Sequence, residues 1–189
     1  MEKPTKKLIL ITGNKEKIAI ARAALESAPI ILEAKNIDCV EIQSDEITEI
    51  AKTAAKHASR MLNANVIKVD TGLFIEALNG FPGPYSSYVE RHLTAEQILR
   101  MMQGEDNRKA VYREALAYCE AGGEPVVFTA STPGEIATRA SGKYGWNFDR
   151  IFIVNEDTQP MSHLRDEKRI RKYNDANWKS LIEYVISKK

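Results

Sequence analysis

The feature that most constrains the fold is an apolar, β-rich run over residues 7–11 that is followed almost at once by a helical pattern. The run reads Lys-Leu-Ile-Leu-Ile, which is typical of a buried strand. Thr12-Gly13-Asn14 ends it, and apolar residues then recur at helical spacing over residues 16–25, before Pro29. A strand that leads directly into a helix predicts an α/β protein.

The later elements continue this alternation and then change to a hairpin. We expect strands over residues 30–32 and 37–42, a helix over 47–62 with Asp45 as its N-cap, and a strand over 66–69 that ends before Asp70. Further on we expect a rigid turn over 81–84, a helix over 93–102 capped by Thr94, a hairpin of strands 110–118 and 126–130, a strand over 151–154 and a helix over 178–186. No linker divides the chain, so we predict one domain over residues 1–189, built on a mixed sheet flanked by helices.

The charges almost cancel, with 27 basic and 26 acidic residues and a net charge of +1. Proteins that bind nucleic acid polymers usually carry a much larger basic excess, so we exclude such a polymer, and an anionic membrane surface, as partners. The balance is not uniform along the chain. Residues 1–25 and 161–189 are basic, whereas residues 41–50 hold four acidic residues and no base. A small anionic ligand is not excluded, because it needs only a local region of positive charge.

Cysteine usage and the N-terminal sequence point to a cytoplasmic protein. Cys39 and Cys119 are far apart and share no metal-binding spacing, so we expect two reduced thiols. The apolar run after the basic N-terminus is too short for a signal peptide or a membrane span.

Two segments suggest phosphate and metal chemistry. A glycine turn at a helix start, with Lys15 and Lys17 close by, can bind an anion through backbone N–H groups; the alternative is a turn that only starts the helix. Asp70-Thr71-Gly72 follows a buried strand, where α/β proteins place ligand contacts; the alternative is a capped turn. The acidic stretch 41–46 offers oxygen ligands of the kind that Mg²⁺ prefers, although it could equally be a solvated face.

Two later segments suggest a nucleotide base. Residues 142–149 combine glycines, Trp146, Phe148 and Asp149, and aromatic faces stack on bases; the alternative is an aromatic plug in the core. Residues 165–172 hold five basic side chains, a run that is usually a solvated face. Ser162 and His163 are adjacent, but no GxSxG elbow supports a hydrolase dyad.

Four motifs occur in one fixed order: Thr12-Gly13-Asn14-x-x-Lys17, Asp70-Thr71-Gly72-Leu73, the run Asn-Gly-Phe-Pro-Gly-Pro-Tyr-Ser over 79–86, and Phe148-Asp149-x-Ile151-Phe152. This order resembles the inosine triphosphate pyrophosphatase family, also called the Ham1 family. The resemblance implies hydrolysis of non-standard purine nucleoside triphosphates (ITP, dITP, XTP) to the monophosphate and pyrophosphate. It also implies Mg²⁺ as cofactor, a homodimer, and a long mixed sheet in two lobes with a central cleft.

The resemblance further implies roles for individual residues. Those that hold the triphosphate are Thr12, Gly13, Asn14, Lys17, Thr71 and Gly72. Asp70 is the catalytic carboxylate and, together with Glu41 on a second strand, a metal ligand. The substrate-binding residues nearer the base are Trp146 as the stacking ring, Phe148, Asp149 as the group that orients the base, Lys168, Lys172 and Tyr173.

The sequence also departs from the family pattern at three places. Val69 replaces a glutamate before the catalytic aspartate, Asn147 replaces a glycine, and residues 171–174 replace a Ser-His-Arg motif that reads the base. Two alternatives therefore stay open beside the main interpretation: the same chemistry on a different nucleotide, and a nucleotide-binding protein with impaired catalysis.

Overall fold

The computed structural model describes residues 6–188. Its strands are β1 (Lys6–Ile11), β2 (Ile30–Lys35), β3 (Val66–Ile75), β4 (Pro82–Gly83), β5 (Lys109–Cys119), β6 (Val126–Ile136) and β7 (Phe152–Val154). Its α-helices are α1 (Lys15–Leu25), α2 (Ile47–Leu62), α3 (Ser86–His92), α4 (Ala95–Met101), α5 (Asp166–Ile170) and α6 (Ala176–Ser187). Among these residues, no helix combines the length and apolar character needed to cross a membrane.

The strands form one seven-stranded mixed sheet, which confirms the predicted fold class. The order is β2-β1-β3-β5-β6-β7, with β4 paired to β3. β1 runs parallel to both β2 and β3, whereas β4 and β7 run antiparallel to their neighbours. The parallel part matches the strand–helix alternation at the start of the sequence, because parallel neighbours need a crossover between them.

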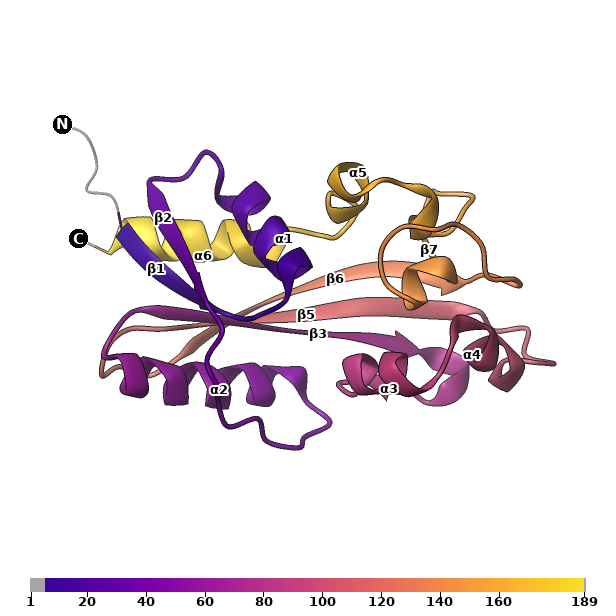
Figure 1. Ribbon diagram of the computed structural model, residues 1–189, viewed down its shortest axis with the longest axis horizontal. Coiled ribbons are helices and arrows are strands. Elements are labelled where there is room, and N and C mark those ends of the chain that lie inside the picture. The colour runs from indigo at the N-terminus through magenta and orange to yellow at the C-terminus, as the bar shows by residue number, and fades with distance from the viewer. Residues whose placement is uncertain (1–5, 189) are drawn as a thin grey trace. The chain divides into compact units, whose positions relative to one another are not determined.

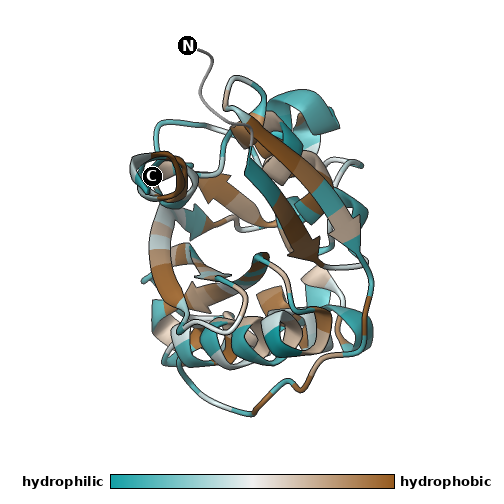
Figure 2. Cartoon of the chain, turned by 90° about the vertical axis from the view of Figure 1, so that its left-hand side faces the viewer, coloured by the Kyte–Doolittle hydropathy of each residue, from teal (hydrophilic) through white to brown (hydrophobic). Residues whose placement is uncertain are grey.

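The chain divides into two compact units, and β3, β5 and β6 each contribute residues to both. The first unit comprises the chain up to Asp70, Glu114–Ala130 and the segment from Asp175 onward. Within it, α1 and α6 lie on one face of the strands and α2 on the other (Figure 1). Its strands are mainly apolar, whereas α2 alternates between polar and apolar residues (Figure 2), because only one face of that helix is buried. The main core cluster of this unit joins β1, β3, β5, α1 and α6.

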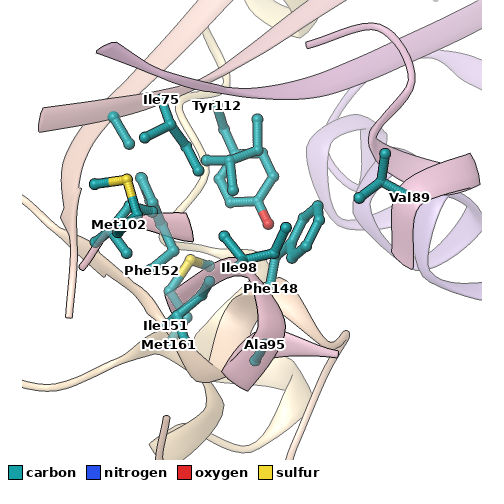
Figure 3. Close-up of a cluster of buried hydrophobic side chains, with 13 residues drawn as sticks. Ile75, Val89, Ala95, Ile98, Met102, Tyr112, Phe148, Ile151, Phe152 and Met161 are labelled. Carbon is teal, nitrogen blue, oxygen red and sulfur yellow. The ribbon is translucent and has the colours of Figure 1, made fainter. Parts of the chain in front are cut away.

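The second unit comprises Thr71–Arg113 and Ser131–Asn174. Its core gathers aromatic and aliphatic side chains from the ends of the long strands, from α3 and α4, and from the segment around β7 (Figure 3). Tyr112 lies at the centre of this cluster and meets the Phe152 ring edge-on, with 4.7 Å between the ring centroids. The expected division into lobes with a central cleft stays a prediction.

Three expectations about local structure are wrong. Residues 37–42 form no strand, because Val40 and Ile42 are exposed in the loop between β2 and α2 and have no sheet to pack against. Asp45 is not the cap of α2; the N-cap position belongs to Glu46, whose N–H donates to Ser44 Oγ. The third strand does not end before Asp70 but continues to Ile75.

Other local predictions are confirmed. Thr94 caps α4 in a capping box with Gln97, in which each side chain bonds the backbone N–H of the other residue. β5 and β6 occupy the predicted hairpin segments and are neighbours in the sheet, although β6 extends beyond residue 130 to Ile136. Cys39 and Cys119 are both free thiols.

Candidate functional site

The turn between β1 and α1 is held by its own side chains. Asn14 is the N-cap of α1, and its Oδ1 accepts hydrogen bonds from the backbone N–H groups of Glu16 (2.9 Å) and Lys17 (3.3 Å). Thr12 Oγ1 accepts from the Asn14 N–H. A side chain at Gly13 would require Asn36 to move, because a Cβ would lie 2.8 Å from Cγ of Asn36. Two amides of the helix start are therefore already used by the cap, so the Lys17 side chain becomes the main candidate for binding an anion here.

Lys17 connects this turn to β3. Its Nζ donates to the backbone carbonyl of Val69 at 2.9 Å. Burial lowers the pKa of the Lys17 amine, and the negative charges of Asp70, Glu114 and Glu41 oppose this effect. The first unit thus brings together a buried ammonium group and the predicted catalytic and metal-binding carboxylates.

The two predicted metal ligands have different surroundings. Asp70 is half-buried in the middle of β3. Glu41 lies on the exposed loop after β2, and its Oε1 accepts a hydrogen bond from Lys68 Nζ at 2.9 Å. That bond holds the pKa of the Glu41 carboxyl below its usual range, so the group is ionised and able to bind a cation.

Asp70 and Glu41 offer oxygen donors of the type that a magnesium ion shared with a substrate would need. Within residues 6–188, no group of three or more His, Cys, Asp or Glu side chains could hold a metal ion by itself. Mg²⁺ commonly takes one or two carboxylates and completes its octahedral shell with substrate phosphates and water. Asp70 and Glu41 supply such a partial set. The departure at Val69 adds no ligand, because that side chain is buried in the core of the first unit.

Glu114 on β5 is a further carboxylate near Lys17 that the sequence motifs do not include. Its Oε1 accepts hydrogen bonds from Asn177 Nδ2 (2.6 Å) and Trp178 Nε1 (3.1 Å), and its charge opposes the lowering of the Lys17 pKa by burial. One signal was available: Glu114 is the only carboxylate in the predicted strand over residues 110–118. A carboxylate in a largely buried strand usually has a partner or a function.

Thr71 and Gly72 continue β3 into the second unit. Gly72 must be a glycine, because a Cβ there would overlap the backbone carbonyl of Gly83 on the paired strand β4. Ser86 reinforces this contact: its Oγ accepts from the Leu73 N–H and donates to the Gly83 carbonyl. The family motif over residues 79–86 therefore supports the strand that carries Asp70, Thr71 and Gly72.

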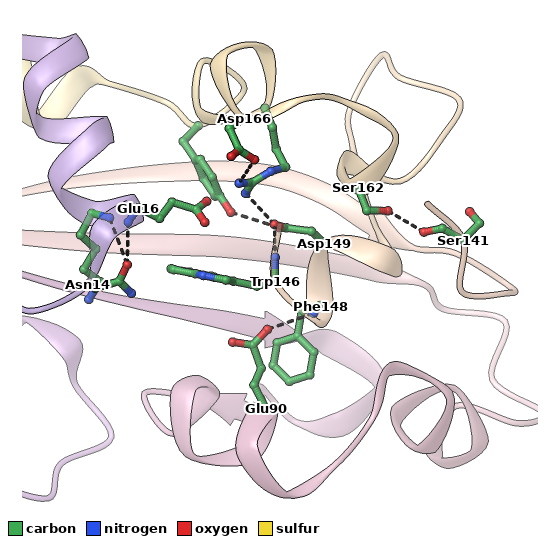
Figure 4. A network of polar contacts seen from close by, with 12 residues as sticks. Asn14, Glu16, Glu90, Ser141, Trp146, Phe148, Asp149, Ser162 and Asp166 are labelled. Atoms are coloured by element: carbon green, nitrogen blue, oxygen red, sulfur yellow. Dashed lines mark hydrogen bonds and ion pairs between the residues drawn. The ribbon is translucent and has the colours of Figure 1, made fainter. Parts of the chain in front are cut away.

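Trp146 and Asp149 lie on one tight turn. Asp149 Oδ2 accepts from the Trp146 N–H at 2.9 Å and from Arg169 Nη1 at 2.7 Å, and its Oδ1 accepts from Tyr173 Oη at 3.3 Å (Figure 4). Asp149 is completely buried, whereas Trp146 is partly exposed. The structure thus shows Asp149 bonded within the second unit, and its role in orienting the base stays a prediction.

Phe148 belongs to the core of the second unit rather than to a ligand-facing surface. Its ring is fully buried in the cluster of Figure 3, while its backbone N–H donates to Glu90 Oε1. The neighbouring Asn147, which stands where the family has glycine, accepts from the Ala95 N–H and donates to the Leu93 carbonyl. The segment is a turn followed by a short 3₁₀ helix. The side-chain amide of Asn147 connects this segment to the start of α4.

The three remaining residues that were predicted to contact the base differ in their exposure to solvent. Lys168 is exposed on α5. Lys172 forms an ion pair with Asp157, with 2.6 Å between Nζ and Oδ1. Tyr173 donates its hydroxyl to Asp149 and packs its ring edge-on against Tyr112. Of these three, Lys168 is the one that the structure presents to solvent, whereas the other two are engaged within the second unit.

The Ser162–His163 pair forms no hydrolase dyad. Ser162 Oγ donates to the Ser141 carbonyl (Figure 4) and is buried, while His163 Nε2 lies 2.9 Å from the hydroxyl of Ser141 rather than that of Ser162.

Comparison with known proteins agrees with the motif order. A model of the Ham1 family matches residues 8–172. The chain belongs to the Ham1 family. Members named dITP/XTP pyrophosphatase include one from Methanopyrus kandleri, 41% identical over 165 residues that cover 87% of this chain and 88% of that protein. Another, from Korarchaeum cryptofilum, is 36% identical over 179 residues, covering 95% and 96% of the two chains.

Solved structures of Ham1 proteins share the fold. The Staphylococcus aureus Ham1 protein superposes with a TM-score of 0.81 at 25% identity, over 97% of this chain and all of that one. The HAM1 protein of Coxiella burnetii superposes with a TM-score of 0.83 over 95% of this chain and 98% of that one.

Proposed function

We propose that this Ham1 family chain hydrolyses non-standard purine nucleoside triphosphates, such as dITP and XTP, to the nucleoside monophosphate and pyrophosphate. The observation that supports this most is the grouping of Lys17 with the carboxylates of Asp70 and Glu41 in the first unit. The names of relatives up to 41% identical suggest the substrate class. Removal of such nucleotides cleanses the precursor pool, a task that we assign to the cytoplasm.

In this proposal the first group of residues handles the phosphates. Water attacks the α-phosphorus, a new P–O bond forms, and the bond to the bridging oxygen breaks to release pyrophosphate. Asp70 accepts the proton from the attacking water. Lys17 binds the departing pyrophosphate, on which negative charge increases during the reaction.

The proposed cofactor is Mg²⁺, held by Asp70 and Glu41 together with the substrate. The chemistry that it supplies when bound is neutralisation of negative charge on the phosphate oxygens. Glu41 would exchange its bond to Lys68 for the ion. Glu41 is the exposed partner of this pair, so its carboxylate can turn toward an ion from the solvent side, whereas Lys68 is largely buried.

The second group handles the base in this proposal. Trp146 supplies a partly exposed ring for stacking, and Lys168 supplies an exposed donor. Because residues 171–174 stand in place of the family's Ser-His-Arg motif, the base preference of this chain has to be measured.

A substrate panel tests the proposed function. The chain is incubated with Mg²⁺ and each of dITP, XTP, ATP, GTP and dUTP, and kcat/KM is measured from pyrophosphate release. The proposal predicts the highest kcat/KM for dITP or XTP. A preference for dUTP or a standard nucleotide would instead support the same chemistry on a different base, and binding without turnover would support an impaired enzyme.

We also propose that the chain forms a homodimer. Phe81, Tyr85 and Tyr88 expose large aromatic side chains around the start of α3, and 58% of Tyr88 is accessible. Exposed apolar patches often mark association surfaces. Light scattering is expected to give twice the 21.2 kDa chain mass, and Tyr88→Glu is expected to give monomers. A monomeric mass for the unaltered chain would contradict the proposal.

A further inference from the structure

The turn that carries Trp146 is held by a buried ion pair. One partner, Asp149, lies in the turn, and the other, Arg169, lies on α5. Asp149 is completely buried and Arg169 is 2% exposed, and Nη1 of the arginine lies 2.7 Å from Oδ2 of the aspartate. An isolated buried carboxylate takes up a proton rather than bear the loss of hydration. Arg169 places a positive charge beside Asp149, and the same Oδ2 accepts the hydrogen bond from the Trp146 N–H.

The arginine and the turn are in direct contact. Gly145 has a φ of +77°, and a Cβ at this position would overlap the Asp149 carboxylate and lie 2.7 Å from Cζ of Arg169. The glycine thus allows the guanidinium to lie against the turn. Any displacement of Arg169 opens space directly beside the backbone that carries Trp146.

The same guanidinium also holds the segment that carries Lys168. Its Nη2 donates to Asp166 Oδ1 at 3.1 Å, at the start of α5, and Lys168 lies two residues further on the same short helix. One planar group therefore connects the Trp146 turn with α5 through two different nitrogens (Figure 4 labels Trp146, Asp149 and Asp166).

We propose that Arg169 is a positioning residue for base recognition, and that it determines which nucleotide the chain prefers by fixing Trp146 relative to Lys168. The inference rests on the proposed function for the identity of the ligand, but its geometry stands on the contacts of the second unit alone. Arg169 touches neither phosphate nor base. It acts through the turn and through α5.

The first test compares Arg169→Lys with Arg165→Lys, an exposed arginine that immediately precedes α5. Lysine keeps the positive charge but has no planar fork with which to bond Asp149 and Asp166 together. For Arg169→Lys we expect KM for the preferred nucleotide to rise about ten- to hundredfold, as for loss of a charge-assisted hydrogen bond, with kcat little changed. The kcat/KM ratio of XTP to GTP should move toward one.

A purely structural role would give a different result. Partial unfolding lowers the amount of active enzyme for every nucleotide equally and leaves the XTP/GTP ratio unchanged. Asp166→Asn provides a milder variant, because Asp166 is exposed and its loss does not leave a charge buried. With Glu167→Gln as its control, we expect a smaller shift of the ratio in the same direction.

A second readout needs no turnover. The chain has two tryptophans, and Trp178 is buried, so iodide quenching reports mainly on Trp146. We expect a larger quenching constant for Arg169→Lys than for Arg165→Lys. If the unaltered chain hydrolyses no triphosphate, the proposed function fails. The quenching comparison alone then tests whether Arg169 positions Trp146. Equal quenching constants, or an unchanged XTP/GTP ratio in an active Arg169→Lys variant, would overturn the proposal.

Discussion

At the residue scale, the balance of charge around Lys17 is the centre of the proposed chemistry. Its ammonium group is buried, bonded to the Val69 carbonyl, and attracted by Asp70, Glu114 and Glu41. A buried cation is costly unless such partners compensate for lost hydration. The arrangement is suited to binding an anion that approaches the carboxylates together with a divalent cation.

Replacing Lys17 by methionine should weaken substrate binding without disrupting the packing of α1. Methionine preserves the apolar stem but removes the charge that binds phosphate. We expect KM to rise about ten- to hundredfold, as for loss of a charged hydrogen bond. Steady-state kinetics check this expectation, with the exposed Lys15→Met as the matched control, and equal KM values for the two variants would remove Lys17 from the phosphate site.

Replacing Asp70 by asparagine should remove the proton acceptor while keeping the shape of the side chain. We expect turnover to fall roughly a hundred- to ten-thousandfold, the usual contribution of a general base. Circular dichroism should stay unchanged. Asp106→Asn, a change of the same type at an exposed position, is the control, and turnover retained in Asp70→Asn would mean that another group activates water.

The sequence predicts the surroundings of a residue best when its bonding partners are close to it along the chain. Asn14 caps a helix that begins next to it, so the motif reveals its place. Asp149 is different, because its partner Arg169 is twenty residues away and only the folded chain shows the ion pair between them. Phe148 carries the same ambiguity, since an aromatic side chain suits a core and a base equally well.

At the element scale, the turn over residues 145–149 is tied to α4 as well as to α5. Asn147 accepts from the first N–H of α4 and donates to the Leu93 carbonyl just before it. The amide thus adds to the capping box made by Thr94 and Gln97. The substitution of the family glycine at this position is explained by that additional support.

Asn147→Ala should destabilise the fold by about 1 kcal/mol, the usual cost of removing a cap. For a chain of this length, that corresponds to a fall in Tm of about 2–4 °C. Thermal unfolding followed by circular dichroism measures it. Asn107→Ala, on an exposed loop, is the comparison, and an equal or smaller fall in Asn147→Ala would show that the amide does not support α4.

Tyr118 on β5 should make stability depend on alkaline pH. Burial, followed by the charge of Glu120, raises the pKa of its hydroxyl above the usual value of about 10. The unfolded chain then loses this proton first as pH rises, so the contribution of Tyr118 is complete below about pH 10 and declines above it. Tyr118→Phe should cost about 1 kcal/mol at neutral pH, through loss of the bond to Glu120.

The measurement for Tyr118 is urea unfolding of both proteins near neutral pH and above about pH 10. The difference in free energy of unfolding between them should shrink at the higher pH. Tyr144→Phe, at a partly exposed ring outside the core clusters, is the control. A difference that grows with pH would contradict the assigned direction of the shift.

Element prediction fails where burial, rather than periodicity, decides the outcome. The apolar residues over 37–42 predict a short strand, yet Val40 and Ile42 are exposed in a loop. Asp70-Thr71-Gly72 has the composition of a turn, but pairing of residues 73 and 74 with β4 continues the strand through it. Most of the helices and the hairpin were predictable, because their periodicity and turn residues agree with the sheet that they cover.

At the scale of the whole molecule, the near-zero net charge combines local regions of opposite sign. Basic residues gather near both ends of the sequence and acidic residues at 41–50, and the first unit contains Lys17 together with Glu41. Such a protein does not need a basic surface to bind a compact anion. The Ham1 family match over residues 8–172 spans both units. The residues proposed to bind the phosphates and those proposed to bind the base therefore belong to one family pattern.

The central claim is that this chain cleaves a nucleoside triphosphate between its α- and β-phosphates. Its most direct test is the identification of products by ion-exchange chromatography after incubation of XTP or dITP with Mg²⁺. We predict equal amounts of monophosphate and pyrophosphate, both lost in Asp70→Asn. Release of nucleoside diphosphate and single phosphate, or no product from any triphosphate, would contradict the account.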